Sequence, residues 1–485
     1  MAPATETTSA AGPSAAQKLT FVTMTAMVVG SMVGAGVFSL PRRFAQETGI
    51  LGAMIAWLIA GSGMLMMAFV FQMLAMRKPE LDAGVYAYAK AGFGEYLGFF
   101  SAFGYWASAC VGNVTYWVLI MTTVGAIAPA LGDGDTLLAI VLSSAGIWVF
   151  YSLIRRGVKD AAVINRIVTV AKMVPILVFI LLTIFALDPQ VFADNLRGGS
   201  DLGSLFSQVK GTMLITVFVF LGVEGASVYS RHAERREDVG RATVLGFLMV
   251  FAVFASVTIV SYGVLPYDEI AELRQPSVGG VLEAAYGQWG MVFVSVGLIV
   301  SVLGAYLAWT LMAAEVLLVA AKDDDMPRFL RKVNPTTDVP GAALLMTTIL
   351  VQVMLVVATL SQDAFNFALD LTSALTLIPF LLAASYALKL VVTRETYEEQ
   401  PQGRTRELVI AVLATIYMAF LLIAAGPKFM LVSFIIYAPA SVLFVMARRE
   451  QGRQLFSPAE LVILAVSIAG AVVGVVAIVT GWITI

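Results

Sequence analysis

The chain has 485 residues, of which 59% are hydrophobic and only 13% are charged, and its formal net charge is −2. A soluble globular protein carries about 25% charged residues. A soluble fold cannot bury this much apolar surface, so we expect most of the chain to face the lipid bilayer. This excludes a cytosolic enzyme and a disordered regulator, and the balanced charge gives no support to a nucleic-acid partner.

Reactive side chains are scarce, which narrows the available chemistry. The single cysteine, Cys110, cannot form an internal disulfide, and the single histidine, His232, cannot build a multi-histidine metal site. We therefore expect no metal, no cofactor and no enzymatic reaction. Carboxylates, lysine, hydroxyls, aromatic rings and exposed backbone groups remain as the chemistry within the membrane.

Long hydrophobic segments follow a small, polar stretch at 1–18, which we interpret as a disordered cytoplasmic tail. A membrane span needs about 20 mostly apolar residues. The sequence predicts thirteen spans, at 19–41, 50–76, 95–130, 136–154, 161–187, 207–230, 242–265, 287–321, 341–360, 364–390, 408–426, 429–447 and 460–482. We expect the spans at 95–130 and 287–321 to tilt or to continue into the headgroups, because they exceed one perpendicular crossing.

The distribution of Lys and Arg predicts the orientation. Most of them fall in connections on the same side as the amino terminus, and cytoplasmic loops collect basic residues. We therefore expect the amino terminus inside and, with thirteen spans, the carboxyl terminus outside. Without the span at 460–482 the carboxyl terminus would be inside. We interpret the basic loop around His232 and the acidic run at 322–326 as solvated cytoplasmic surface.

Glycines interrupt the first and sixth spans in a matching pattern. Residues 34–38 (GAGVF) line up with residues 225–229 (GASVY), 191 positions later. Each glycine weakens a helix by about 1 kcal/mol relative to alanine, although small residues also allow close helix packing. An offset of five spans inverts the second copy, and paired interruptions in inverted halves indicate a transporter's binding site.

Two such breaks at mid-membrane free backbone groups that lipid cannot satisfy. The amino-terminal end of a half-helix carries partial positive charge and suits a carboxylate. The carbonyls at the end of the opposing half-helix suit an ammonium group. The pair of breaks is therefore a candidate receptor for the backbone of a free amino acid.

Four ionisable residues lie within or beside the spans, where a charge is costly and usually functional. Glu224 lies in the second break and can hold a cationic group or titrate; alternatively, it caps freed amides. Lys172, in the fifth span, can act as a tethered cation or a titrating gate; alternatively, it snorkels to the inner surface. Glu315 and Asp370 can contact a cationic side chain or belong to structural networks.

Aromatic and polar residues cluster in the third span. Tyr105, Asn113 and Tyr116 can line a cavity, whereas Trp106 and Trp117 also suit an interfacial aromatic belt. In the eighth span, a tryptophan at 309 can stack on a guanidinium or ammonium group, or it can simply pack.

The interrupted spans, together with the segment at 308–327 (AWTLMAAEVLLVAAKDDDMP), resemble the amino acid–polyamine–organocation transporters over roughly residues 20–450. Within them the chain is similar to the basic amino acid antiporters, in particular the bacterial arginine/ornithine antiporters. The resemblance implies an all-α polytopic membrane protein of two inverted five-helix repeats with broken first and sixth helices, plus peripheral helices. We expect the repeats at 19–190 and 205–392, and the peripheral helices at 408–485.

The resemblance also assigns roles to residues of this sequence. The first break holds the substrate carboxylate, the residue at 309 stacks on the substrate's guanidinium, and the lysine at 172 replaces a sodium site. The substrate-binding positions that it implies are Met32, Gly34, Ala35, Gly36, Asn113, Phe218, Leu221, Glu224, Trp309 and Thr372. The gating or coupling positions are Tyr105, Lys172 and Glu224.

Three departures from the related arginine/agmatine antiporters bear on specificity. Ala35 replaces a serine, Phe218 replaces a tryptophan, and Phe380 replaces a tyrosine after the tenth-span proline. The lost hydroxyls and the smaller ring argue against arginine/agmatine exchange. They leave arginine/ornithine exchange or lysine as the substrates.

We therefore expect an alternating-access antiporter in the bacterial inner membrane that exchanges arginine for ornithine, with lysine as a further substrate. The expected partners are these small molecules and the lipid bilayer; a homodimer stays open. The alternatives are a proton-coupled lysine or polyamine permease and an amino-acid-binding membrane sensor. The sequence leaves open which of Glu224, Glu315 and Asp370 contacts the substrate side chain.

Overall fold

The computed structural model describes residues 20–81, 84–157, 161–224, 236–337, 339–398 and 402–484, and the described residues form helices and connecting turns. The longer helices are α3 (Ile50–Arg77), α5 (Glu95–Gly125), α6 (Leu137–Arg155), α7 (Ala161–Phe185), α12 (Arg236–Ser261), α15 (Gln288–Lys322), α16 (Gly341–Ala358), α17 (Ala364–Thr393), α18 (Arg404–Ala424), α19 (Gly426–Glu450) and α20 (Pro458–Val479). The predicted all-α fold is confirmed.

Shorter elements complete the chain. They are α1 (Phe21–Met32), η1 (Gly36–Ser39), α2 (Leu40–Ala45), α4 (Val85–Phe93), η2 (Pro129–Leu131), α8 (Pro189–Asp194), η3 (Ser200–Leu202), α9 (Leu205–Gly211), α10 (Met213–Phe220), α13 (Tyr267–Glu272), α14 (Ser277–Tyr286) and η5 (Arg328–Arg331). The span predicted to run to residue 130 ends earlier, because a turn at Ala126 and η2 follow Gly125.

Within the described residues, each predicted span coincides with a helix or a helix pair; residue 19 of the first predicted span and residues 225–230 of the sixth lie outside them. Ten described helices are long and apolar enough to cross a membrane, and the bent pair at 21–45 makes an eleventh. The span predicted at 161–187 contains the shorter apolar stretch Ala171–Phe185, and the span predicted at 207–230 overlaps the stretch Leu205–Phe220. Helix α20, which corresponds to the thirteenth predicted span, is also long and apolar enough to cross a membrane. A capping box of Ser457 and Glu460 defines its start.

Contacts between helices of the two halves occur in matching pairs. In the first half, α1 packs on α12 and α5 packs on α17. The corresponding helices of the second half, α9–α10 and α15, pack on α3 and α7. This reciprocal pattern is what a pair of inverted repeats requires, whereas the exact limits of the repeats stay a prediction.

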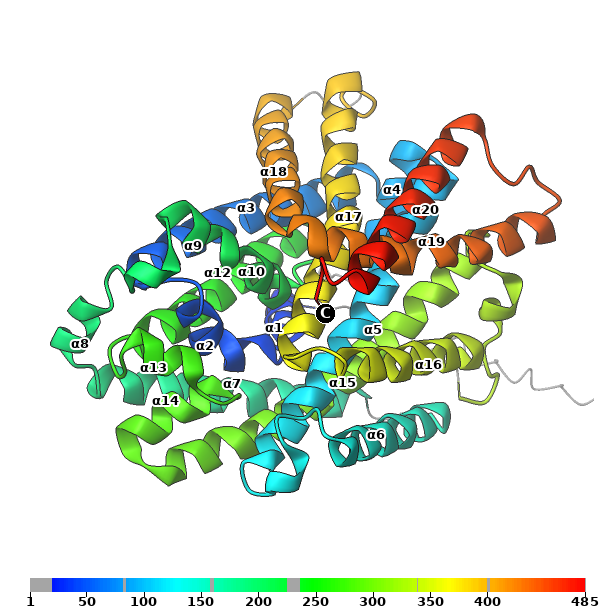
Figure 1. The fold of residues 1–485 in the computed structure, drawn as a ribbon. Helices are drawn as coiled ribbons and strands as arrows, with labels where there is room; N and C mark the ends of the chain where they lie inside the picture. The colour runs from blue at the N-terminus through cyan, green and yellow to red at the C-terminus, as the bar shows by residue number, and fades with distance from the viewer. Residues whose placement is uncertain are drawn as a thin grey trace, which may run out of the picture.

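The centre of the molecule is α5, whose residues are almost all buried, whereas most residues of α6 and α20 are exposed or only partly buried. Figure 1 shows α5 crossing the middle of the bundle and α6 at its lower edge. An apolar helix with this much exposed surface is suited to lipid. The core therefore surrounds α5 and the helices of both halves that pack on it.

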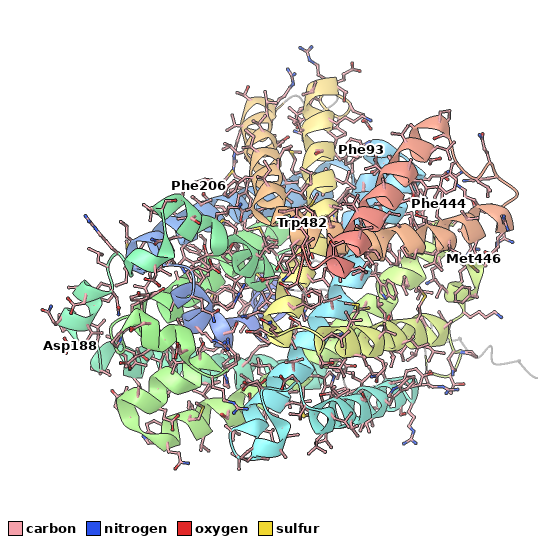
Figure 2. All side chains as sticks on the ribbon, viewed as in Figure 1. Phe93, Asp188, Phe206, Phe444, Met446 and Trp482 are labelled. Carbon is pink, nitrogen blue, oxygen red and sulfur yellow. The ribbon has the colours of Figure 1, made fainter. Side chains whose placement is uncertain are left out.

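The two ends of the bundle carry different connections. One end, which we call the basic end, holds Lys90, Lys389, Arg448 and Arg453, which bind the carbonyl oxygens of Asp323 and Gly92 and the carboxylate of Glu95. The opposite end holds α8, α13 and α14, which Figure 1 shows on the left of the view. Figure 2 shows Asp188 on the left and Phe93, Phe444 and Met446 of the basic end toward the right.

Candidate functional site

The first predicted break is confirmed. Helix α1 ends at Met32, Val33 has the extended ψ of 97°, and helical structure resumes at Gly36. The segments on either side of the break meet at an angle of 46°. The end of α1 therefore presents carbonyls without intrahelical partners, and the start of η1 presents N–H groups without them.

The second break begins at Leu221, one turn before the glycine motif that predicted it. Leu221 is extended (ψ 135°), and Gly222 has φ +104°, a conformation that favours glycine. The motif at 225–229 lies outside the described residues. The described residues confirm that the sixth span is interrupted, beginning at Leu221, which the sequence had included among the binding positions.

The two breaks are in direct contact. The Ser31 hydroxyl lies 2.9 Å from the carbonyl oxygen of Val28 and 3.0 Å from that of Gly222, so its one hydrogen is shared between these two acceptors. A Cβ at Gly222 would lie 2.7 Å from the Ser31 carbonyl carbon, so only glycine permits this approach. Nearby, a Cβ at Gly36 would lie 2.8 Å from the Phe218 ring and 2.7 Å from Val219.

Lys172, on α7, is buried, and its ammonium group lies at the first break. Its ammonium group donates to the carbonyl oxygens of Gly30 and, at 2.8 Å, Val33. A cation at a helix carboxyl end satisfies freed carbonyls and interacts favourably with the helix dipole. The snorkelling alternative is wrong, because only 3% of the Lys172 surface is exposed.

Glu224 occupies the second break and is also buried. Its Oε2 accepts from the Gly222 N–H (3.0 Å), and its Oε1 accepts from the Tyr105 hydroxyl (2.5 Å). The alternative that Glu224 caps a freed amide is thus confirmed. Tyr105 connects this carboxylate to α5 and also lies 3.5 Å from the Met312 sulfur of α15.

Two further predicted binding residues, Asn113 on α5 and Thr372 on α17, lie at contacts between helices. The Asn113 Nδ2 donates to Thr310 Oγ1 (3.1 Å), while its buried Oδ1 accepts no hydrogen bond from a described residue. The Thr372 hydroxyl donates to its own helix, at Ala368 (2.7 Å), and its methyl group would be 3.3 Å from a Cβ at Gly112. Asn113 therefore offers a free acceptor, whereas the Thr372 hydroxyl is already engaged as a donor.

The remaining predicted binding residues divide by burial. Five are buried in or beside the breaks: Met32, Ala35, Gly36, Phe218 and Leu221. Gly34 is partly buried, and a Cβ there would lie 3.2 Å from the Tyr116 hydroxyl. Trp309 is partly buried on α15 beside Thr310, and the stacking role assigned to it stays a prediction.

The interfacial interpretation of two tryptophans is wrong. Trp106 is buried and donates to Thr347 Oγ1 (2.9 Å), and Trp117 is buried against Phe150 and Tyr306. Both rings belong to the core around α5, because this helix has protein neighbours on every side. Composition alone cannot separate a core tryptophan from a membrane-interface tryptophan.

Asp370 belongs to an ion-pair network. It accepts a charged hydrogen bond from Arg43 (2.7 Å), and the neighbouring Arg42 lies 3.6 Å from Asp363. Together these pairs tie α2, which directly follows the first break, to α17. Sequence reasoning missed both arginines and Asp363; the available signal was two adjacent arginines after a helix break and two aspartates seven residues apart. Glu315 is exposed and forms no ion pair with a described residue.

The acidic run at 322–326 is not a uniformly solvated surface, as its composition had suggested. Asp325 is buried and lies 2.8 Å from Lys90, and Asp323 accepts from the Tyr86 hydroxyl. Burial raises the pKa of Asp325 to about 6, although Lys90 opposes the shift. These contacts join α4 to the end of α15 at the basic end.

A helical membrane protein with two touching helix breaks has the architecture of a secondary transporter. The amino acid permease family matches residues 19–447, so the chain belongs to this family. An arginine/ornithine antiporter of Pseudomonas aeruginosa is 47% identical, over 97% of this chain and 99% of the relative. An L-lysine transport protein of Corynebacterium glutamicum is 38% identical over 95% of each chain. A Latilactobacillus sakei arginine/ornithine antiporter is 36% identical, over 97% of this chain and 99% of the relative.

Proposed function

We propose that this chain is an antiporter that exchanges cationic amino acids, arginine for ornithine, by alternating access. The contact between the two breaks, where Ser31 binds the carbonyl of Gly222, carries the proposal. It places both sets of freed backbone groups in one region. The similarity to two arginine/ornithine antiporters supports the substrate pair, and the lysine transport relative supports lysine as a further substrate.

In this proposal the first N–H groups of η1, at Gly36, receive the substrate carboxylate, because they lack intrahelical acceptors. Glu224 and the free Oδ1 of Asn113 are the polar groups offered to cationic groups of the substrate. Trp309 stacks on the side-chain cation. Lys172 holds the carbonyls of α1 in place of a coupling ion.

Exchange requires that the loaded site changes conformation more readily than the empty one. A ligand shifts a conformational equilibrium only through its different affinities for the two states. A substrate held by both breaks makes contacts that depend on their relative position, which provides this difference. The Arg43–Asp370 pair is the proposed closure at the end opposite the basic end. Arginine and ornithine both carry net charge +1, so one-for-one exchange is electroneutral.

The test is uptake of labelled arginine into proteoliposomes loaded with ornithine, lysine, agmatine or buffer alone. Strong uptake against ornithine and little against buffer supports exchange. Uptake into unloaded vesicles that depends on a pH gradient would instead identify a proton-coupled permease, and binding without uptake would identify a sensor. Glu224→Ala and Trp309→Ala should abolish exchange. Trp289→Ala, on the same helix but 51% exposed, should not.

We further propose that the protein lies in the bacterial inner membrane with the basic end and the amino terminus in the cytoplasm. The gathering of Lys90, Lys389, Arg448 and Arg453 at one end supports this orientation. Cysteines introduced at Arg449 and at Asp188, both exposed, test it, because only the second should react with an impermeant thiol reagent added to intact cells. A homodimer is a separate proposal, which cross-linking in membranes tests.

A further inference from the structure

A cavity of about 570 Å³ lies at the basic end, between the end of α3 and the start of α18, and its lining includes no residue of the two breaks. The volume is within the range of small-molecule sites. Its walls combine apolar side chains, among them Phe69, Met76 and Ile410, with the charged groups of Arg77, Arg406 and Glu407.

The charged side chains that line the cavity carry a net positive charge. Arg77 Nε lies 2.6 Å from the Glu407 carboxylate, so these two residues form a neutral pair. Arg406 is exposed, its guanidinium lies 5.7 Å from the centre of the Phe69 ring, and it forms no ion pair with a described residue. This arginine is therefore the charge available to an anionic ligand.

The first turn of α18 adds backbone donors at the same place. Gly403 precedes the helix and provides no side-chain cap, and the helix continues for 21 residues. Its first N–H groups carry partial positive charge and lack intrahelical acceptors. Together with Arg406, they form the kind of anion site that phosphate groups occupy.

An exposed apolar surface continues from the cavity along α18. Val409, Leu413 and Ile416 are exposed at 52%, 47% and 61% on this membrane-spanning helix. Met76, on the cavity wall, is exposed at 55%. A molecule that fits the whole feature needs an anionic head for the cavity and a long apolar chain for the helix surface.

We propose that this cavity binds an anionic phospholipid, with its phosphate at Arg406 and the first turn of α18 and one acyl chain along α18. Basic pockets between transmembrane helices are known to recognise such headgroups. The bound lipid connects α3, which belongs to the first half, to α18 outside both halves. The proposal is independent of which amino acid the protein transports.

The test measures lipid binding by the purified full-length chain with native mass spectrometry and thermal denaturation. Phosphatidylglycerol should be retained and should raise the Tm more than phosphatidylcholine does. Arg406→Ala should weaken phosphatidylglycerol binding about tenfold, as loss of one charge-assisted contact does, and Arg406→Glu should abolish the preference. The matched control is Arg449→Ala, an exposed arginine at the same end, which should retain it.

Three outcomes would overturn the proposal. They are equal retention of the two lipids by the wild type, an equal loss in Arg449→Ala and Arg406→Ala, and full retention in Arg406→Glu. Glycerol 3-phosphate serves as a soluble competitor. If it alone produced the stabilisation, the occupant would be a free phosphate compound and not a lipid.

Discussion

The Ser31 hydroxyl binds the carbonyl oxygen of Gly222, and the two residues are 191 positions apart. The two glycine motifs of the sequence have the same offset, so Ser31 and Gly222 occupy equivalent positions of the two halves. Equivalent residues in contact place the breaks side by side where the halves meet. A movement of either half-helix therefore acts directly on the other break.

This contact predicts that Gly222→Ala abolishes exchange. Alanine at φ +104° is strained, and its Cβ would approach the Ser31 backbone to 2.7 Å. Strain of this kind costs about 1–3 kcal/mol before the steric clash is counted. The measurement is arginine counterflow, made with purified variant that size-exclusion chromatography shows to be free of aggregates.

Gly452→Ala is the matched control, because Gly452 also has positive φ (66°) but a Cβ there meets nothing within 4 Å. It should lose stability without losing exchange. Ser31→Ala removes only the hydroxyl, worth about 1 kcal/mol, and should slow exchange without abolishing it. Normal exchange by Gly222→Ala would show that the close approach of the breaks is not required.

Glycine spacing predicted both breaks because a broken helix is a local property of the chain. The partners of Lys172 and Asp325 were not predictable in this way. Lys172 binds carbonyls about 140 residues away on another helix, and Asp325 is buried by the approach of α4. The sequence shows a charge and its position along a helix, but its burial and its partner depend on how helices from distant segments pack.

Lys172→Met should abolish exchange and lower thermal stability together. Methionine has similar length but cannot donate to the carbonyls of Gly30 and Val33, which would then be buried without a partner. An unsatisfied buried polar group costs about 1–3 kcal/mol. The Tm in detergent and counterflow in proteoliposomes measure the two effects. An unchanged Tm would contradict the structural role of Lys172, whatever its role in transport.

The Arg43–Asp370 pair offers a test by charge exchange. Removing one partner of a buried ion pair costs about 3–5 kcal/mol, and the two side chains are only 8% and 13% exposed. Arg43→Asp and Asp370→Arg should each reduce exchange at least tenfold, and the double variant should recover much of it. Arg42→Asp, at the looser 3.6 Å pair with Asp363, should have a smaller effect. Additive losses in the double variant would argue that the two residues act separately.

Asp325 should make stability depend on pH in a defined direction. Its pKa is about 6 in the fold, against an ordinary value of 3.8, so the folded protein binds the proton more tightly than the unfolded chain does. The resulting contribution to stability is fully present below about pH 4 and is lost as the pH rises through 6, with a total on the order of 2–3 kcal/mol.

Asp325→Asn removes this titration while keeping an oxygen that faces Lys90. The Tm of the variant relative to wild type should therefore rise between pH 5 and pH 7.5. Asp324→Asn, at the exposed neighbour, is the matched control for removing one carboxylate from this acidic run. A constant difference for Asp325→Asn would mean that Lys90 offsets the burial of this carboxylate, so that the contact between α4 and α15 does not respond to pH.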